Sequence, residues 1–255
     1  MKCSTTIEEN RDVIVGVKVR LSTGVTGNGR LEKEVYRRAI TSASKCNVPL
    51  MVHHILSTIP VQSTEDYSDL SCPGNLSKGD IYTHSFHGHN TTIIDDSLKK
   101  VHPNVLKARG GGVLFDVGHG QGSFSWERAR VSMESNFLPD TISTDLHTGN
   151  IHGPVHDLLL VMSRFLHLGM PLKKVIGAVT SKAAEAIRKV ESLGSLEIGR
   201  EADITILKLI DCDIWLEDCH GKAENLKQIL IPVAVWKGGK KYEIKDLENY
   251  PVSAS

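Results

Sequence analysis

The stretch "VGVKVRLS", residues 15–22, decides the fold class. Its four apolar residues alternate with glycine or polar residues, which is the period-two pattern of a β-strand. Lys18 lies in the middle of this pattern. A lysine is rarely buried unless it is paired. The stretch is therefore either an edge strand with Lys18 in solvent, or a central strand whose lysine is deprotonated, paired or chemically modified.

On both sides of this stretch, strand-like and helix-like segments alternate as far as about residue 190. The runs with the apolar content of strands cover 12–22, 48–54, 81–88, 112–120 and 140–147. The runs with helical spacing or helix signals cover 29–47, 97–111, 125–137, 155–169 and 171–190. Such alternation predicts a parallel sheet with helices packed outside it, and therefore the α/β class.

The pattern changes after residue 193. Residues 194–209 and 229–244 read as short antiparallel strands joined by glycine turns. We therefore expect two parts, a strand–helix part over 1–192 and a β-rich part over 193–255.

The composition narrows the range of functions. The 255 residues carry 30 Lys plus Arg and 30 Asp plus Glu, and this zero net charge argues against nucleic acid or an anionic membrane as partner. No apolar run reaches the roughly 20 residues that a membrane helix needs. The five cysteines are scattered and form no C-x-x-C motif, and the start of the sequence lacks the apolar core of a signal peptide. These features predict a reduced, cytoplasmic location.

Chemically active side chains follow the predicted strands at their carboxyl ends, which gather on one face in parallel α/β folds. These residues are His53 and His54, His84, His119, and Asp145 and His147. Each one alone also has a plain structural explanation, such as a hydrogen-bonded histidine or a helix-capping aspartate. Together with Lys18, histidine and aspartate converging on one face indicate a metal site.

The glycine-rich stretch "GHGQGSF", residues 118–124, offers an alternative, because such a loop before a helix can bind phosphate. Its spacing is G-x-G-x-G rather than G-x-G-x-x-G, and no acidic ribose partner ends the next strand. Dinucleotide binding is therefore disfavoured. We expect these glycines to let the backbone pass close to a ligand.

The ordered motifs resemble the amidohydrolase superfamily, and within it the dihydroorotase-like deacetylases. The resemblance rests on "VGVKVRLS", "PLMVHH", "GDIYTHSFHG", "FDVGHGQGSFSW" and "FLPDTISTDLHTGN", with a similar tail in "GSLEIGREADITILKL" and "PVAVWKGGKKYEI". It covers nearly the whole chain. It implies about strands 4 to 8 of a metal-dependent-hydrolase (β/α)8 TIM-like barrel, plus a remnant of a small β-sandwich domain.

The resemblance also implies roles for particular residues. Lys18 would be carboxylated on its side-chain nitrogen and would bridge two metals, and the site, which is incomplete in this chain, would hold one or two ions of zinc or another divalent metal. His53, with His54 as the alternative, and His84 would be further ligands, and Asp145 would bind metal and carry the proton. The residues implied near the substrate are His119, Gly120 and His147.

The implied activity is metal-dependent, deacetylase-like hydrolysis of an amide or ester bond in a small acyl compound. One feature departs from the family: no H-x-H metal pair of a first barrel strand precedes Lys18. We therefore expect a carboxyl-terminal fragment, a shortened isoform or an incomplete gene model. Its sheet would have open edges, through which it would associate into a homo-oligomer. The alternative is a truncated relative that is catalytically inactive.

Overall fold

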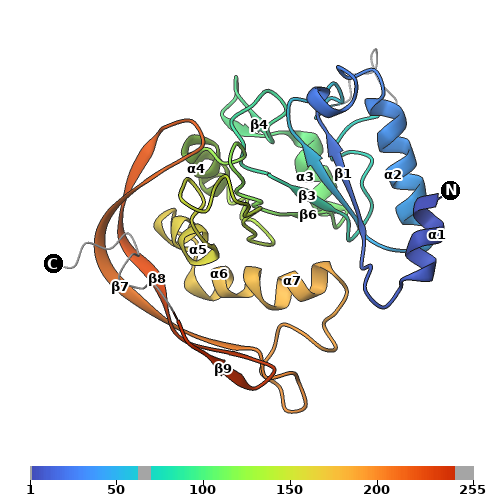
Figure 1. Ribbon diagram of the computed structural model, residues 1–255. Helices are drawn as coiled ribbons and strands as arrows, with labels where there is room; N and C mark the ends of the chain where they lie inside the picture. Colours follow the sequence, from blue (N-terminus) through green and yellow to red (C-terminus); the bar gives the residue numbers. More distant parts are fainter. Residues whose placement is uncertain (1, 63–69, 245–255) are drawn as a thin grey trace.

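A parallel sheet forms the centre of the molecule, as the computed structural model shows for residues 2–62 and 70–244 (Figure 1). Its strands, in spatial order, are β1 (Val17–Leu21), β2 (Leu50–His54), β3 (Ile81–Thr83) and β6 (Leu114–Phe115). Each neighbouring pair is parallel. The predicted α/β class is confirmed.

Helices connect and cover the strands. They are α1 (Lys2–Glu9), α2 (Glu32–Cys46), α3 (Pro103–Gly110), α4 (Trp126–Glu134), α5 (Leu158–His167), α6 (Leu172–Val179) and α7 (Ser181–Ala186). A 3-10 turn, η1 (Thr23–Val25), and a small antiparallel pair, β4 (Ile94–Asp95) with β5 (Lys100–Val101), complete this part. Ser125 is the N-cap of α4, and its hydroxyl accepts a bond from the Arg128 amide.

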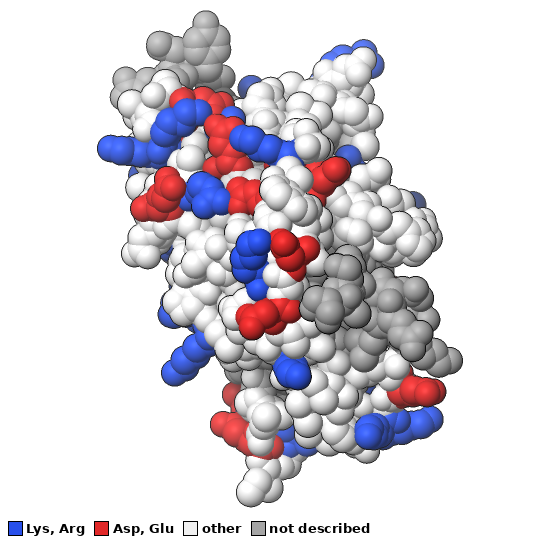
Figure 2. Space-filling model, turned by 90° about the vertical axis from the view of Figure 1, so that its left-hand side faces the viewer, with Lys and Arg blue, Asp and Glu red and all other residues white. Residues whose placement is uncertain are grey.

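A long antiparallel sheet follows the helices. It contains β7 (Ile204–Glu217), β8 (Ala223–Lys237) and β9 (Lys240–Tyr242), with register shifts in the β7–β8 pair. The sheet curves around α5, at the left of Figure 1. On the described part of its outer face, acidic and basic side chains are interspersed (Figure 2). For example, Lys227 Nζ lies 2.7 Å from Asp213 Oδ1.

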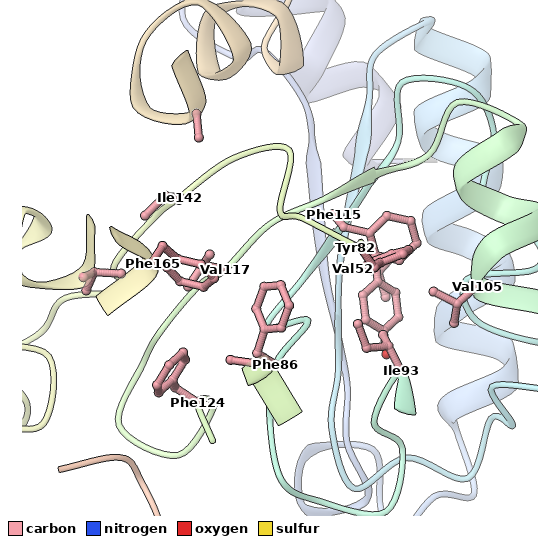
Figure 3. Packing of buried hydrophobic residues seen from close by; sticks show 14 of the residues in the cluster. Val52, Tyr82, Phe86, Ile93, Val105, Phe115, Val117, Phe124, Ile142 and Phe165 are labelled. Carbon is pink, nitrogen blue, oxygen red and sulfur yellow. The ribbon is translucent and has the colours of Figure 1, made fainter. Parts of the chain in front are cut away.

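Aromatic and aliphatic side chains fill the space between the central sheet and its helices (Figure 3). Tyr82 and Phe115, from neighbouring strands, pack with ring centroids 5.6 Å apart. On the side of α5, the Phe86 and Phe165 rings lie 5.4 Å apart. All four side chains are fully buried, so the core fixes the strand ends that follow Tyr82 and Phe115 in the chain.

Several predicted elements differ in extent from the observed ones. The expected strand over 12–22 is regular only in β1, and the expected helix over 97–111 begins at Pro103, which suits a first helical turn. The expected helix over 171–190 divides into α6 and α7 at Thr180, whose ψ of −97° is not helical.

The strand expected over 140–147 is reduced to a single parallel bridge between Asp116 and Thr141. The segment still runs beside β6, because the Val117 amide donates to the Thr141 carbonyl and the Gly120 amide donates to Thr144. At Asp145 the backbone turns to a φ of 49°, and this ends the extended conformation.

Within the described residues the sheet is open rather than closed into a barrel. β2 is the only strand partner of β1 there, and the 140–144 segment lies at the other edge. The change from helices to antiparallel strands falls between α7 and β7. The domain division at 192/193 stays a prediction. No helix in the described ranges is both long enough and apolar enough to cross a membrane.

Candidate metal centre

Two buried histidines face each other at the carboxyl ends of neighbouring parallel strands. His53 belongs to β2, and His84 follows β3 directly. Their ring centroids are 4.4 Å apart, with the ring planes at 74°. The side chains of His53 and His84 are therefore close enough to bind one ion together.

The hydrogen bonds of these rings leave nitrogens free for a ligand. His84 Nδ1 lies 2.5 Å from the Gly118 carbonyl oxygen. A carbonyl only accepts, so Nδ1 carries the hydrogen and Nε2 keeps its lone pair. Neither ring nitrogen of His53 forms a hydrogen bond within the described part of the chain.

Both rings are held in the neutral form, which is the form that binds metals. Burial, and then the neighbouring His84 ring, lower the pKa of His53 to about 2. Burial also lowers the pKa of His84, although the bond to Gly118 opposes that shift.

Lys18 belongs to the same neighbourhood, because it interacts electrostatically with both histidines and with Asp116 and Asp145. Lys18 is partly exposed to solvent. Partial burial of its amine nevertheless lowers the pKa of Lys18, although the carboxylates of Asp116 and Asp145 act in the opposite direction. The neutral amine is the form that can add carbon dioxide and become a carbamate, with release of a proton. The role of Lys18 as a carboxylated ligand stays a prediction.

Backbone strain is stored at two of the predicted ligands. His84 and Asp145 have φ values of 61° and 49°, in the left-handed region that residues with a Cβ adopt only at a cost. Asp145 lies in an exposed turn, where its carbonyl accepts a bond of 3.0 Å from Asn150 Nδ2. Unlike a buried ligand, its carboxylate is therefore accessible from solvent.

Gly118 and Gly120 allow the backbone to pass close to these ligands. A Cβ on Gly118 would lie 2.8 Å from His84 Nδ1, and one on Gly120 would lie 3.0 Å from Asp145 Oδ2. Both glycines have positive φ values. The side chains of His84 and Asp145 therefore lie against these two glycines.

The other predicted residues occupy different surroundings. His54 is fully buried, and both its nitrogens have partners, the Tyr82 hydroxyl at 3.0 Å and the Ile59 carbonyl at 2.8 Å. His54 therefore has no nitrogen free for a metal, which leaves His53 as the ligand candidate on β2.

Of the residues implied near the substrate, His119 is fully buried and stacks on Phe124 with centroids 4.6 Å apart. Its Nε2 has no hydrogen-bond partner within the described residues. His147 lies in the exposed turn after Asp145. The Gly120 amide is engaged by Thr144. Their roles toward a substrate stay predictions.

The donor set fits a divalent cation in part. Two neutral imidazoles with free nitrogens are typical zinc ligands. No three His, Cys, Asp or Glu side chains of the described ranges are grouped as a complete site. A carbamate on Lys18 would add the missing oxygen ligand, because lysine in its unmodified form cannot serve as one. Such a modification would bring the candidate ligands to three, the number of protein ligands that a catalytic zinc has beside its open position.

Sequence reasoning missed one residue beside this site. Asp116 follows the buried run of β6 and is itself only 2% exposed. Its carboxylate accepts bonds from three hydroxyls, those of Thr83, Thr141 and Ser143, at 2.6–2.7 Å. A carboxylate directly after an apolar strand is the signal that could have identified it.

Comparison with known proteins identifies the family. The family model described as "Amidohydrolase family" matches residues 3–241. The chain belongs to the amidohydrolase family.

Curated relatives of this amidohydrolase carry the name deacetylase. "Deacetylase Atu3266" of Agrobacterium fabrum is 34% identical over 226 residues, which are 88% of this chain and 52% of the relative. A deacetylase of Enterococcus faecalis is 31% identical over 238 residues, which are 93% of this chain and 62% of the relative. The chain thus spans about half to three fifths of the length of these relatives.

Solved structures share the fold. A structure titled as an adenine deaminase matches with a TM-score of 0.84 and 30% identity, over 94% of this chain and 63% of that one. A structure titled as a dihydroorotase matches with a TM-score of 0.77 and 32% identity, over 93% and 59%. The predicted superfamily and its deacetylase branch are confirmed.

Proposed function

We propose that this chain supplies metal ligands and the proton-transferring aspartate of a deacetylase that acts on a small N-acetyl or O-acetyl compound. The observation that carries the proposal is the facing pair His53 and His84, each with a free ring nitrogen, beside Lys18. The names of the curated relatives support the deacetylase reaction. We further propose zinc as the ion and the cytoplasm as the location, which suits five unpaired cysteines.

The chain's own residues would divide the chemistry as follows. His53, His84 and carboxylated Lys18 would hold the ion. A divalent cation in such a site polarises a carbonyl oxygen and lowers the pKa of water toward neutrality. Asp145, whose carboxylate is exposed beside Gly120, would accept a proton from the attacking water and deliver it to the leaving group. His84 would be kept in the correct orientation by its bond to Gly118.

The remainder of the substrate would lie beyond Gly120. A cavity of about 580 Å³, within the usual range for small-molecule sites, is lined there by Gln121, His156 and Trp215, among others. We propose that the part of the acyl compound that does not react occupies this cavity. His147, in the neighbouring turn, would contact the substrate from the other side.

Metal analysis together with an assay tests the proposal. The chain is purified, its zinc content is measured by mass spectrometry, and a panel of N-acetyl and O-acetyl compounds is assayed before and after treatment with a chelator. We expect bound zinc in the wild type and its loss in His53→Asn and His84→Asn, with activity falling at least about a hundredfold. His102→Asn is the matched control, because His102 lies at the start of α3 and forms no hydrogen bond through its ring within the described residues.

The outcomes separate the proposal from its alternatives. Zinc that is retained by both histidine variants would contradict the site. Zinc bound by the wild type without any turnover would favour an inactive relative. Turnover of adenine or dihydroorotate, included because an adenine deaminase and a dihydroorotase share the fold, would replace the proposed acetyl substrate.

A further inference from the structure

We infer that Asp116 is a positioning residue that holds the strand ends carrying His84 and Asp145 at a fixed distance from each other. This inference rests on the proposed function, in which His84 is a metal ligand and Asp145 transfers the proton. Asp116 touches neither a free ring nitrogen nor the open side of the site. It acts through the hydroxyl groups of the residues next to the ligands.

The hydrogen bonds of Asp116 connect both flanking segments to one carboxylate. Oδ2 accepts from Thr83 Oγ1 at 2.6 Å and from Ser143 Oγ at 2.7 Å. Oδ1 accepts from Thr141 Oγ1 at 2.7 Å. A shift of the carboxylate would therefore be transmitted to both sides of β6.

The bonded residues are close to the predicted ligands in the chain. Thr83 immediately precedes His84, and Ser143 lies two residues before Asp145. Both ligands have strained, left-handed backbones that persist only where the surroundings hold them. The 140–147 segment is joined to β6 and the residues after it by one bridge, between Asp116 and Thr141, and by backbone hydrogen bonds such as that from the His119 amide to the Ser143 carbonyl. The three hydroxyl bonds add side-chain links to this backbone pairing and extend them to Thr83 on the other side of β6.

The charge of Asp116 gives a second reason. An aspartate that is 2% exposed, and whose hydrogen-bonding side-chain partners among the described residues are all hydroxyls, carries a desolvation cost that an asparagine would avoid. Its electrostatic effect reaches Lys18 and His84. A negative charge on Asp116 would favour a cation at the neighbouring ligands.

Cobalt binding tests the inference with a measurement other than turnover. Co²⁺ is titrated into metal-free full chain and its visible absorption is recorded for the wild type, Asp116→Asn, Thr83→Val and Thr83→Ser. We expect Asp116→Asn and Thr83→Val to weaken Co²⁺ binding about 10- to 100-fold, as the loss of a group that orients a metal ligand does. Thr83→Ser keeps the hydroxyl and should therefore bind Co²⁺ with the affinity of the wild type. Ser132→Ala is the structural control, because it removes an equally buried hydroxyl bond, to the Phe137 carbonyl, away from the site.

A second readout needs no metal. The imidazole nitrogen resonances of the metal-free protein report the position of each histidine ring. We expect Asp116→Asn to move the Nδ1 resonance of His84 and to leave that of His54 unchanged. Unchanged His84 resonances together with wild-type Co²⁺ affinity in Asp116→Asn would overturn the inference. If the wild type itself binds no Co²⁺, the proposed function fails, and the His84 resonances alone decide whether Asp116 positions that ring.

Discussion

Gly118 illustrates at the scale of one residue how closely the chain is packed around His84. Its φ is +47°, and a Cβ there would lie only 2.3 Å from Thr83 Oγ1. Gly118→Ala should therefore lower the free energy of unfolding by about 2 kcal/mol or more, since overpacking and a left-handed alanine both cost stability. Urea denaturation monitored by circular dichroism measures the change.

The matched control is Gly122→Ala in the same loop. A Cβ on Gly122 would meet no atom of the described residues within 4 Å, and the φ of Gly122 is not positive. Its substitution should change the free energy of unfolding by no more than about 0.5 kcal/mol. Equal effects of the two alanines would show that the loop is not packed as described.

The adjacent residues His53 and His54 show what sequence reasoning can and cannot decide at this scale. Alternation along a strand predicts that the two side chains point to opposite faces. It does not tell which face carries the site, because both residues are equally suited as ligands. His54 is excluded as a ligand only by its hydrogen bonds in the folded chain. Its partners are Tyr82, 28 residues away, and Ile59, 5 residues away.

At the scale of secondary structure, the sequence identified the order of strands and helices but not their ends. The 140–147 run has the residues of a strand, and it does lie beside β6. Its termination at Asp145 depends on a left-handed backbone and on the Asn150 side chain, which no local pattern reveals. For Asp116 the local signal, a carboxylate directly after an apolar strand, was present, but its three hydroxyl partners come from two other segments and no local pattern predicts them.

The contact between α5 and the antiparallel sheet can be tested through Ser163. Its hydroxyl accepts a 2.9 Å bond from the Leu230 amide of β8, and Leu230 is buried. Ser163→Ala should leave that amide without a partner and reduce the free energy of unfolding by about 1–3 kcal/mol. Denaturation midpoints measure the effect, with exposed Ser192→Ala as the control that should be nearly neutral. A neutral Ser163→Ala would argue against this docking of helix on sheet.

For the whole molecule, the open sheet predicts association. Among the described residues β1 pairs only with β2, and an unpaired strand edge invites pairing with another chain. The antiparallel sheet also exposes apolar side chains at Ile206, Leu209 and Val233. Light scattering after size-exclusion chromatography should therefore give a mass above that of one chain and rising with concentration. A constant monomer mass over the accessible concentrations would contradict the expectation.

Joint binding of one ion by His53 and His84 is the central claim about the whole molecule. X-ray absorption at the zinc edge of the zinc-loaded chain tests it most directly, because this measurement identifies the ligand atoms and their distances. We predict two imidazole nitrogens at about 2.0–2.1 Å, the remaining ligands being oxygen, and no bound zinc to give such a spectrum in the His53→Asn, His84→Asn double variant. A spectrum with sulfur at about 2.3 Å, or one unchanged in the double variant, would contradict the claim.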